Sequence, residues 1–552
     1  MSVSSKPTLV DKLGGGLCPP ISIIEGLGSP PERGAPRTAI GRRAPEGALL
    51  PASPQGRIAP AKPALGAWIL TGWVIVTGLA GVVVYVGWLS WPWPLIHDAP
   101  IMHYIAWRIG EGAVPYRDLF DMNFPGVYLL HLVVLRTLGA GDAAWRVFDL
   151  AWLAVTSLTI AALAAPWGRL AAVGGALFFA AYHLGGGAWQ AGQRDFLLCP
   201  FLLLAALGVV SWGERGDWIT LALGGLALGA GATIKPHVVI FALVLVLLLL
   251  LAPGHASRAR WMAALVLAAT VTVVPLAVVA WLAESGGLEP WRRIVVDYLI
   301  PLYARLGRPA VWSVYRWPLW PPIAAVLVLS VGHALVTRRF TFRHAVVTAG
   351  LGYGLLHYVG QGKGWEYHLY PLAAFAAVLL CSEVEAALRA SRLVLGVPML
   401  ASLAMVVVVL GSTGTTTAEA AWIRDKQRLV RVLTSDLEQR VRAGDTVQVL
   451  DTTDGGIHAL FRAQVREPTR FLYDFHFFHD SEHPEIRALR AELVDGLEAS
   501  PPRYIVVFRA GWPTGGYDRI ARFPELARLL ATRYIVDVQR PAYILYAKRD
   551  RS

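Results

Sequence analysis

Charged residues and cysteines are both scarce in this chain. Of its 552 residues only 16% are Asp, Glu, Lys or Arg, whereas 55% are apolar. Soluble domains carry roughly 25% charged residues, so the deficit excludes a cytosolic enzyme and indicates that lipid is the main solvent. The three cysteines are Cys18 in the N-terminal segment and Cys199 and Cys381 within apolar runs. No disulfide between exported loops is therefore expected.

Long apolar runs take the place of the missing charge. A helix needs about 20 apolar residues to cross a bilayer. Eleven runs predict transmembrane helices, near 66–89, 144–165, 170–184, 196–212, 218–234, 237–252, 261–283, 318–337, 344–360, 369–387 and 393–411. A twelfth run, 124–138, is short and contains His131 and Arg136. We interpret it as a juxtamembrane helix in the interface.

The basic residues predict the orientation of these spans. The net charge of +12 could suggest a nucleic-acid partner. With eleven spans, however, arginines fall on every turn of one side: Arg169, Arg215, Arg258, Arg260, Arg338, Arg339, Arg343, Arg389 and Arg392. The positive-inside rule makes that side cytoplasmic. We therefore expect a multi-pass protein of a bacterial-type inner membrane with a cytoplasmic N-terminus and no nucleic-acid partner.

The two ends of the chain differ in composition from the apolar part. Residues 1–62 are rich in Pro, Gly, Ser and Ala and predict a disordered cytoplasmic tail before a membrane domain over 63–411. Residues 412–552 contain charge throughout, short β-rich runs and amphipathic stretches. They predict an exported α/β domain. The fold class is thus a polytopic α-helical membrane protein with a C-terminal α/β domain.

The first outer loop, 90–143, combines acids with aromatic residues. Asp98 follows His97, and Asp121 precedes a Pro-Gly pair. A carboxylate about 3 Å from an acceptor hydroxyl can remove its proton, so both acids are candidate catalytic residues. The alternative is that the acids of this loop only pair with its arginines and order it. That alternative is preferred for Asp118 and Glu111.

Two cations lie where charge is expensive. Lys235 is flanked by apolar runs, and a charge at bilayer depth costs about 2.5–3.5 kcal/mol, so a partner such as a lipid phosphate is expected. Arg194 opens the fourth span and could bind the same phosphate in a fork geometry. The alternatives are an Arg194–Asp195 pair and extension of Lys235 to the headgroups.

The loop 361–368 carries glycines beside Lys363, Trp365, Glu366 and His368. This mixture suits recognition of a sugar or phosphate. The alternative is an aromatic anchor at the membrane surface. Residues 284–317 mix aromatics with arginines and predict an amphipathic lid near the headgroups.

Metal and nucleotide sites have little support in the sequence. His476, His479 and His483 are spaced unlike any standard metal site, and neighbouring phenylalanines favour a packed loop. A divalent metal is compatible with the sequence, but no clear site supports one. No glycine-rich phosphate loop precedes a Lys-Ser/Thr pair, so nucleotide hydrolysis is not expected.

Over 66–411 the pattern resembles the GT-C superfamily of polyprenyl-phosphate-sugar glycosyltransferases, especially protein O-mannosyltransferases and the aminoarabinose transferases that modify lipid A. His97-Asp98, Tyr104, Gly112 and Pro115-Tyr116-Arg117-Asp118 resemble the family's acidic loop segment, and Asp121 resembles its second acid. Arg146, Arg194-Asp195 and Lys235-Pro236 resemble positions that face the donor phosphate or the cavity. Two departures are Ala99, where relatives have a second acid, and Met122, where a basic residue can follow.

The resemblance implies an inverting transfer of a sugar from a polyprenyl-phosphate donor to a lipid, glycan or protein acceptor on the outer face. Asp98 would be the base, with Asp121 as the second catalytic acid. Lys235, Arg194 and Arg146 would bind the donor phosphate, while substrate contacts would come from Tyr116, Arg117, Lys363, Trp365, Glu366 and His368.

Two other functions stay open at this point. One is a flippase or transporter of lipid-linked glycans without covalent chemistry, although no internal repeat is visible. The other is a polymerase or ligase of such glycans.

Overall fold

A computed structural model describes residues 62–306, 317–418, 420–512 and 514–549. The predicted tail, apart from Lys62, lies outside the described residues, as do residues 307–316 of the predicted lid.

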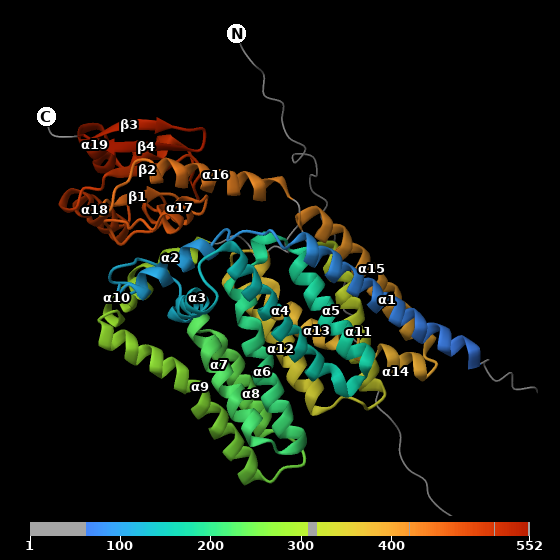
Figure 1. The fold of residues 1–552 in the computed structure, drawn as a ribbon. Helices are drawn as coiled ribbons and strands as arrows, with labels where there is room; N and C mark the ends of the chain where they lie inside the picture. Colours follow the sequence, from blue (N-terminus) through green and yellow to red (C-terminus); the bar gives the residue numbers. More distant parts are fainter. Residues whose placement is uncertain (1–61, 307–316, 419, 513, 550–552) are drawn as a thin grey trace, which may run out of the picture. The chain divides into compact units, whose positions relative to one another are not determined.

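Each of the eleven predicted runs is helical, and the tenth is divided between two helices by a turn. The helices are α1 (Lys62–Leu89), α4 (Asp142–Ala164), α5 (Arg169–Gly185), α6 (Arg194–Arg215), α7 (Trp218–Ile234), α8 (Val238–Leu250), α9 (Ser257–Ser285), α11 (Trp320–Val336), α12 (Phe342–Gln361), α13 (Tyr370–Leu380), α14 (Val384–Arg389) and α15 (Leu393–Ala418). A short 3₁₀ turn, η1 (Ala165–Trp167), follows α4. Figure 1 shows α4, α6, α12 and α13 packed side by side.

The helices confirm a polytopic membrane fold. Among the described residues, 6 helices are long and apolar enough to cross a membrane, and the apolar helices α3, α7, α8 and α11 are shorter. The number of spans, eleven, stays a prediction.

The turn between α6 and α7 shows how the sequence sets helix ends. Gly216 has a φ of 70°, the left-handed conformation that ends many helices. The next residue, Asp217, caps α7 by accepting a hydrogen bond from the Thr220 amide at 3.0 Å. Arg215-Gly216-Asp217 therefore reverses the chain without leaving these helix ends unsatisfied.

Glycines allow the helices around α7 to approach closely. A Cβ atom on Gly208 of α6 would lie 2.6 Å from the Thr220 carbonyl oxygen, and one on Gly229 of α7 would lie 2.4 Å from the Val271 carbonyl oxygen of α9. Both separations are too short for any larger residue. Small residues at such crossings are typical of helix packing in membranes.

One end of the helical body carries the long loops, and we call it the loop end. Its short elements are α2 (Ala99–Gly110), α3 (Pro125–Thr137), η2 (Ala188–Gln190), α10 (Leu288–Arg293), the π-helical η3 (Ile294–Leu299), η4 (Tyr303–Arg305), η5 (Trp317–Leu319) and η6 (Glu366–Leu369). Pro100 and Pro125 lie in the first turns of α2 and α3, where a missing amide hydrogen costs nothing. The segment interpreted as a juxtamembrane helix is α3.

The C-terminal part is the expected α/β domain. Its elements are α16 (Ala421–Glu438), β1 (Val447–Leu450), α17 (Gly456–Ala463), η7 (Phe475–Phe477), α18 (Pro484–Ala499), β2 (Tyr504–Phe508), η8 (Tyr517–Arg522), α19 (Pro524–Arg533), β3 (Tyr534–Gln539) and β4 (Tyr543–Lys548). The four-stranded sheet has the order β1-β2-β4-β3, with β1 parallel to β2 and the other pairs antiparallel. Every residue of β1 and β2 is buried, which places these strands at the domain core.

The first loop and the C-terminal domain are joined by hydrogen bonds. The Phe120 amide donates to the Arg470 carbonyl at 2.6 Å. The Tyr104 hydroxyl donates to the Val465 carbonyl at 3.3 Å and accepts from the Glu467 amide at 3.0 Å. The domain is therefore part of the surroundings of the loop end.

Candidate active site

A cavity of about 380 Å³ lies at the loop end. This volume is within the usual range for small-molecule sites. Of the residues singled out from the sequence, Asp98, Asp121, Arg194, Lys235, Lys363, Trp365 and His368 line the cavity. The structure thus brings together side chains from five separate stretches of the chain.

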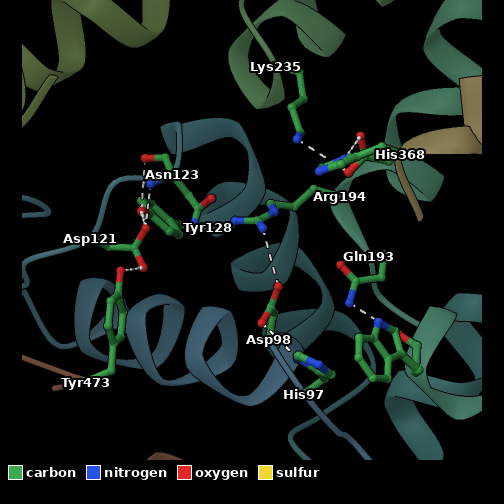
Figure 2. Close-up of polar contacts among 12 residues, drawn as sticks. His97, Asp98, Asp121, Asn123, Tyr128, Gln193, Arg194, Lys235, His368 and Tyr473 are labelled. Atoms are coloured by element: carbon green, nitrogen blue, oxygen red, sulfur yellow. Dashed lines mark hydrogen bonds and ion pairs between the residues drawn. The ribbon is translucent and has the colours of Figure 1, made fainter. Parts of the chain in front are cut away.

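Asp98 is held in the cavity by its neighbours. It is the residue before α2, but its side chain makes no cap hydrogen bond to that helix. Its carboxylate instead contacts His97 Nδ1 at 3.0 Å and accepts from Arg194 Nη2 at 3.3 Å (Figure 2). Burial alone would raise the pKa of Asp98, yet His97, Arg194 and Lys426 hold it below its usual value. Asp98 is therefore an ionised carboxylate facing the cavity.

The residue before Asp98 has an unusual backbone conformation. His97 has a φ of 60°, a left-handed conformation that non-glycine residues seldom adopt. His97 and Asp98 are the two residues that lead into α2, and the imidazole contacts the Asp98 carboxylate. His97 also contacts Trp189, with ring centroids 4.4 Å apart.

Asp121 is a saturated acceptor. Its carboxylate accepts from the Asn123 amide at 2.6 Å, the Tyr128 hydroxyl at 2.8 Å and the Tyr473 hydroxyl at 3.0 Å (Figure 2). Burial raises the pKa of Asp121 in spite of these donors. Because Tyr473 belongs to the C-terminal domain, that domain fixes one wall of the cavity.

The two cations singled out from the sequence each have a partner in the chain. Arg194, the first residue of α6, pairs with Asp98 at 3.3 Å rather than with its neighbour Asp195. Lys235, which ends α7, lies 3.4 Å from the buried Asp195. Figure 2 shows Arg194 between Asp98 and Lys235. The partner expected for the buried Lys235 ammonium is thus the Asp195 carboxylate of the same chain.

Asp195 also contacts two histidines. Its Oδ1 atom lies 2.5 Å from His357 Nε2 and 3.2 Å from His368 Nδ1. Within the described part of the chain, Asp195, His357 and His368 form a group that could hold a metal ion. His476 and His479 instead lie in an aromatic cluster, where His479 Nε2 is 2.8 Å from the Tyr298 hydroxyl.

The loop 361–368 contributes a cation and an aromatic wall. Lys363 Nζ donates to the carbonyl oxygens of Tyr303 at 2.6 Å and Leu306 at 2.8 Å, and burial lowers its pKa to about 8. The Trp365 ring contacts the rings of Trp189 and Trp512, with centroids 6.3 and 6.4 Å away. Such rings suit the apolar faces of a sugar.

Four predicted site residues do not line the cavity. Arg146 is buried, donates to Asp149 and Ser90 at 2.5 Å each and lies over the Trp93 ring, so its guanidinium is engaged elsewhere. Tyr116 is buried with its hydroxyl on the Asn123 carbonyl.

The other two are at the surface or beside the cavity. Arg117 is exposed and pairs with Asp118 at 2.8 Å, which is the arrangement preferred for that acid from the sequence. Glu366 is half-buried beside the lining residues Trp365 and Tyr367.

The sequence missed the contribution of the C-terminal domain. Thr452, Thr453, Tyr473, Phe475 and Trp512 all line the cavity. Tyr303 of the predicted lid and His237 beside Lys235 line it as well. The aromatic residues near Tyr473 could have indicated this part of the cavity. They were interpreted as a packed loop because the local sequence does not distinguish an aromatic residue of the core from one that lines a binding site.

Comparisons with known proteins reveal the fold. No protein-family model and no curated protein sequence matches the chain. ArnT from Cupriavidus metallidurans matches at 13% identity over 87% of this chain and 98% of ArnT in its apo state, with a TM-score of 0.53. ArnT bound to undecaprenyl phosphate matches at 13% identity over 86% and 98%, with a TM-score of 0.52.

A third solved structure is more distant. The archaeal oligosaccharyltransferase AglB from Archaeoglobus fulgidus, in complex with an inhibitory peptide and a dolichol-phosphate, matches at 13% identity over 86% of this chain and 74% of AglB, with a TM-score of 0.47. Sequence identities this low support a shared fold and nothing further. The likeness to ArnT shows that this chain shares the fold of ArnT, and the chain carries a small sheet domain at its C-terminus.

Proposed function

We propose that the chain is a membrane glycosyltransferase that moves a sugar from a polyprenyl-phosphate donor to an acceptor of the cell envelope. The observation that carries this proposal is the meeting of Asp98, Arg194 and Lys235 in one cavity. A carboxylate can take the proton of the acceptor, and two cations can stabilise the charge of a departing lipid phosphate. ArnT, which shares the fold, has been solved with undecaprenyl phosphate bound.

Arg194 and Lys235 are suited to bind the donor phosphate. Their ion pairs measure 3.3 and 3.4 Å, whereas strong charge-assisted hydrogen bonds measure about 2.7–2.9 Å. Each cation therefore retains hydrogen-bonding capacity for a phosphate. Lys363 lines the same cavity and adds a third positive charge.

Asp98 would act as the general base. The acceptor oxygen or nitrogen attacks the anomeric carbon from the side opposite the phosphate while its proton passes to the Asp98 carboxylate. The bond between the anomeric carbon and the phosphate oxygen breaks, and the lipid phosphate leaves with the electron pair. The configuration of the sugar is inverted. Arg194 and Lys235 offset the charge that grows on the leaving phosphate.

The cavity would open on the extracytoplasmic face of a bacterial-type inner membrane. The turns at the other end of the helices carry the arginines that the positive-inside rule assigns to the cytoplasm, among them Arg215 and Arg258. The C-terminal domain is then exported, and the N-terminus is cytoplasmic.

The test uses full-length protein in detergent with a radiolabelled polyprenyl-phosphate sugar and a membrane extract as the source of acceptor. We expect label to move from the donor into a new product, whose size distinguishes a single transfer from polymerisation. No labelled product, together with passage of intact donor across reconstituted vesicles, would replace the transferase by a transporter.

A further inference from the structure

A buried acid and two histidines meet beside the cavity. Asp195 lies in the first turn of α6, His357 on α12 and His368 in η6. The exposed fractions of these residues are 0%, 3% and 3%. Two imidazoles therefore contact one carboxylate oxygen away from water. Burying such polar groups costs free energy unless each of them has a hydrogen-bond or metal partner.

The donor atoms suit a divalent metal ion. One ligand atom from each residue lies within 4.8 Å of the other two. A tetrahedral ion with bonds of about 2.0–2.2 Å needs ligand atoms about 3.3–3.6 Å apart. Asp195 Oδ1 is 3.2 Å from His368 Nδ1, which is close to this separation, but only 2.5 Å from His357 Nε2, so that pair must open by about 1 Å to admit an ion. Two imidazole nitrogens and a carboxylate oxygen are ligands that zinc accepts. Because His368 lines the cavity, the fourth position of such an ion would face the cavity.

A second contact orients one of these ligands. His357 Nδ1 lies 2.7 Å from His237 Nε2. When His357 carries its proton on Nδ1 and donates it to His237, Nε2 presents a lone pair to the ion. Histidine ligands of metals almost always have such an outer partner on the other ring nitrogen.

Lys235 contacts the other oxygen of the Asp195 carboxylate. Its ammonium lies 3.4 Å from Asp195 Oδ2, while both histidines contact Oδ1. An ion on Oδ1 and an ammonium on Oδ2 would share one carboxylate and repel each other. The excess positive charge beside the cavity would be offset by an anion bound there.

We propose that Asp195, His357 and His368 bind one divalent metal ion of the zinc class, with an open position toward the cavity. The site itself does not depend on the transfer reaction. That the bound anion is a donor phosphate rests on the proposed function.

The test measures metal content without any substrate. Full-length protein in detergent is stripped with a chelator and titrated with Zn²⁺ alone. We expect about one tightly held ion per chain. His357→Gln and His368→Gln should each lose the ion, and His237→Gln should weaken binding about 10–100-fold.

Two further variants sharpen the result. His255→Gln is the matched control, because His255 contacts the Gly213 carbonyl at the opposite end of the helices, and it should bind zinc like the wild type. Lys235→Met should bind zinc more tightly, because it removes a neighbouring positive charge.

A variant that does not fold would also lose the ion. The absorption spectrum of Co²⁺ bound to the wild-type protein therefore tests the site without any variant. A four-coordinate spectrum supports the site. The spectrum of the aqueous ion, no zinc retained by the wild type, or equal retention by the ligand variants would overturn it. Because no donor is present, this result is independent of whether the protein transfers sugar.

Discussion

The arginine of the cavity and the buried arginine of the helix core are held in different ways. Arg194 contacts Asp98 at 3.3 Å, and these side chains are 13% and 20% exposed. Arg146 contacts Asp149 at 2.5 Å, with both side chains 1% exposed. Arg146 also donates to Ser90 at 2.5 Å.

The difference separates a binding role from a structural one. A sealed ion pair with short contacts has no capacity for a ligand, and breaking it leaves an uncompensated charge. A longer, partly exposed pair keeps donors available. Although both arginines resemble family positions in the sequence, the contacts favour a ligand-binding role for Arg194 alone.

The largest effect is expected from Asp98→Asn. An amide cannot accept the acceptor's proton, so transfer should fall about 10²–10⁴-fold while the protein stays folded and inserted. The initial rate of label transfer and a thermal unfolding curve measure the two properties. Asp118→Asn, which changes an exposed partner of Arg117, is the control and should stay near the wild type. A normal rate in Asp98→Asn would remove Asp98 as the base.

Arg146→Gln should act on stability. It removes the guanidinium partner of the buried Asp149, which keeps its contact with His183 Nε2 at 3.1 Å. Removing one partner of a buried ion pair costs about 3–5 kcal/mol of unfolding free energy. Thermal unfolding in detergent should therefore shift strongly, while the protein that remains folded binds the donor normally. A donor-affinity loss at unchanged stability would place Arg146 in the binding site after all.

Arg194→Gln should show the opposite pattern. Loss of a charged hydrogen bond costs about 1.5–3 kcal/mol, which weakens donor binding by roughly 10–150-fold. Titration with a polyprenyl phosphate measures this loss, and the unfolding temperature should change less than in Arg146→Gln. Equal effects of both variants on stability would erase the contrast between the two arginines.

Tyr473→Phe tests the wall that the C-terminal domain provides. It removes one of three hydrogen bonds to Asp121, worth about 0.5–1.5 kcal/mol, so we expect a transfer rate about 2- to 13-fold lower. Tyr534→Phe, which removes a hydroxyl from the Pro502 carbonyl in the same domain, should leave the rate unchanged.

The smallest effect concerns pH and Lys363. Because burial lowers its pKa to about 8, donor affinity should weaken as pH rises through 8 and the ammonium loses its charge. Between this value and the unfolded pKa of about 10.4, the unfolded chain binds more protons, so the free energy of unfolding rises with pH in that window. Lys363→Arg should remove both trends. Donor titrations and unfolding curves across the pH range would show whether it does.

Much of the fold follows from local pattern. The apolar runs predicted the positions of the helices because burial in lipid demands continuous apolar sequence. The short run with His131 is the helix α3, and its place in the interface stays a prediction. The β-rich runs of the C-terminal domain gave its four strands. The number of spans is harder, since helices such as α7 and α8 have only 17 and 13 residues.

The candidate site was only partly predictable. Asp98, Asp121, Arg194 and Lys235 were found because charge is rare and expensive in this chain. Tyr473, Thr452 and Trp512 could not be found that way, because aromatic and hydroxyl residues are common in a soluble domain.

The sequence by itself determined that the chain is a membrane protein and which few charges require an explanation. Lipid imposes a continuous apolar pattern, and each exception is visible along the chain. The tertiary structure alone decided which carboxylate each cation meets: Arg194 with Asp98, Lys235 with Asp195 and Arg146 with Asp149. Pairing depends on distances between helices that are remote in sequence, and those distances are set by packing.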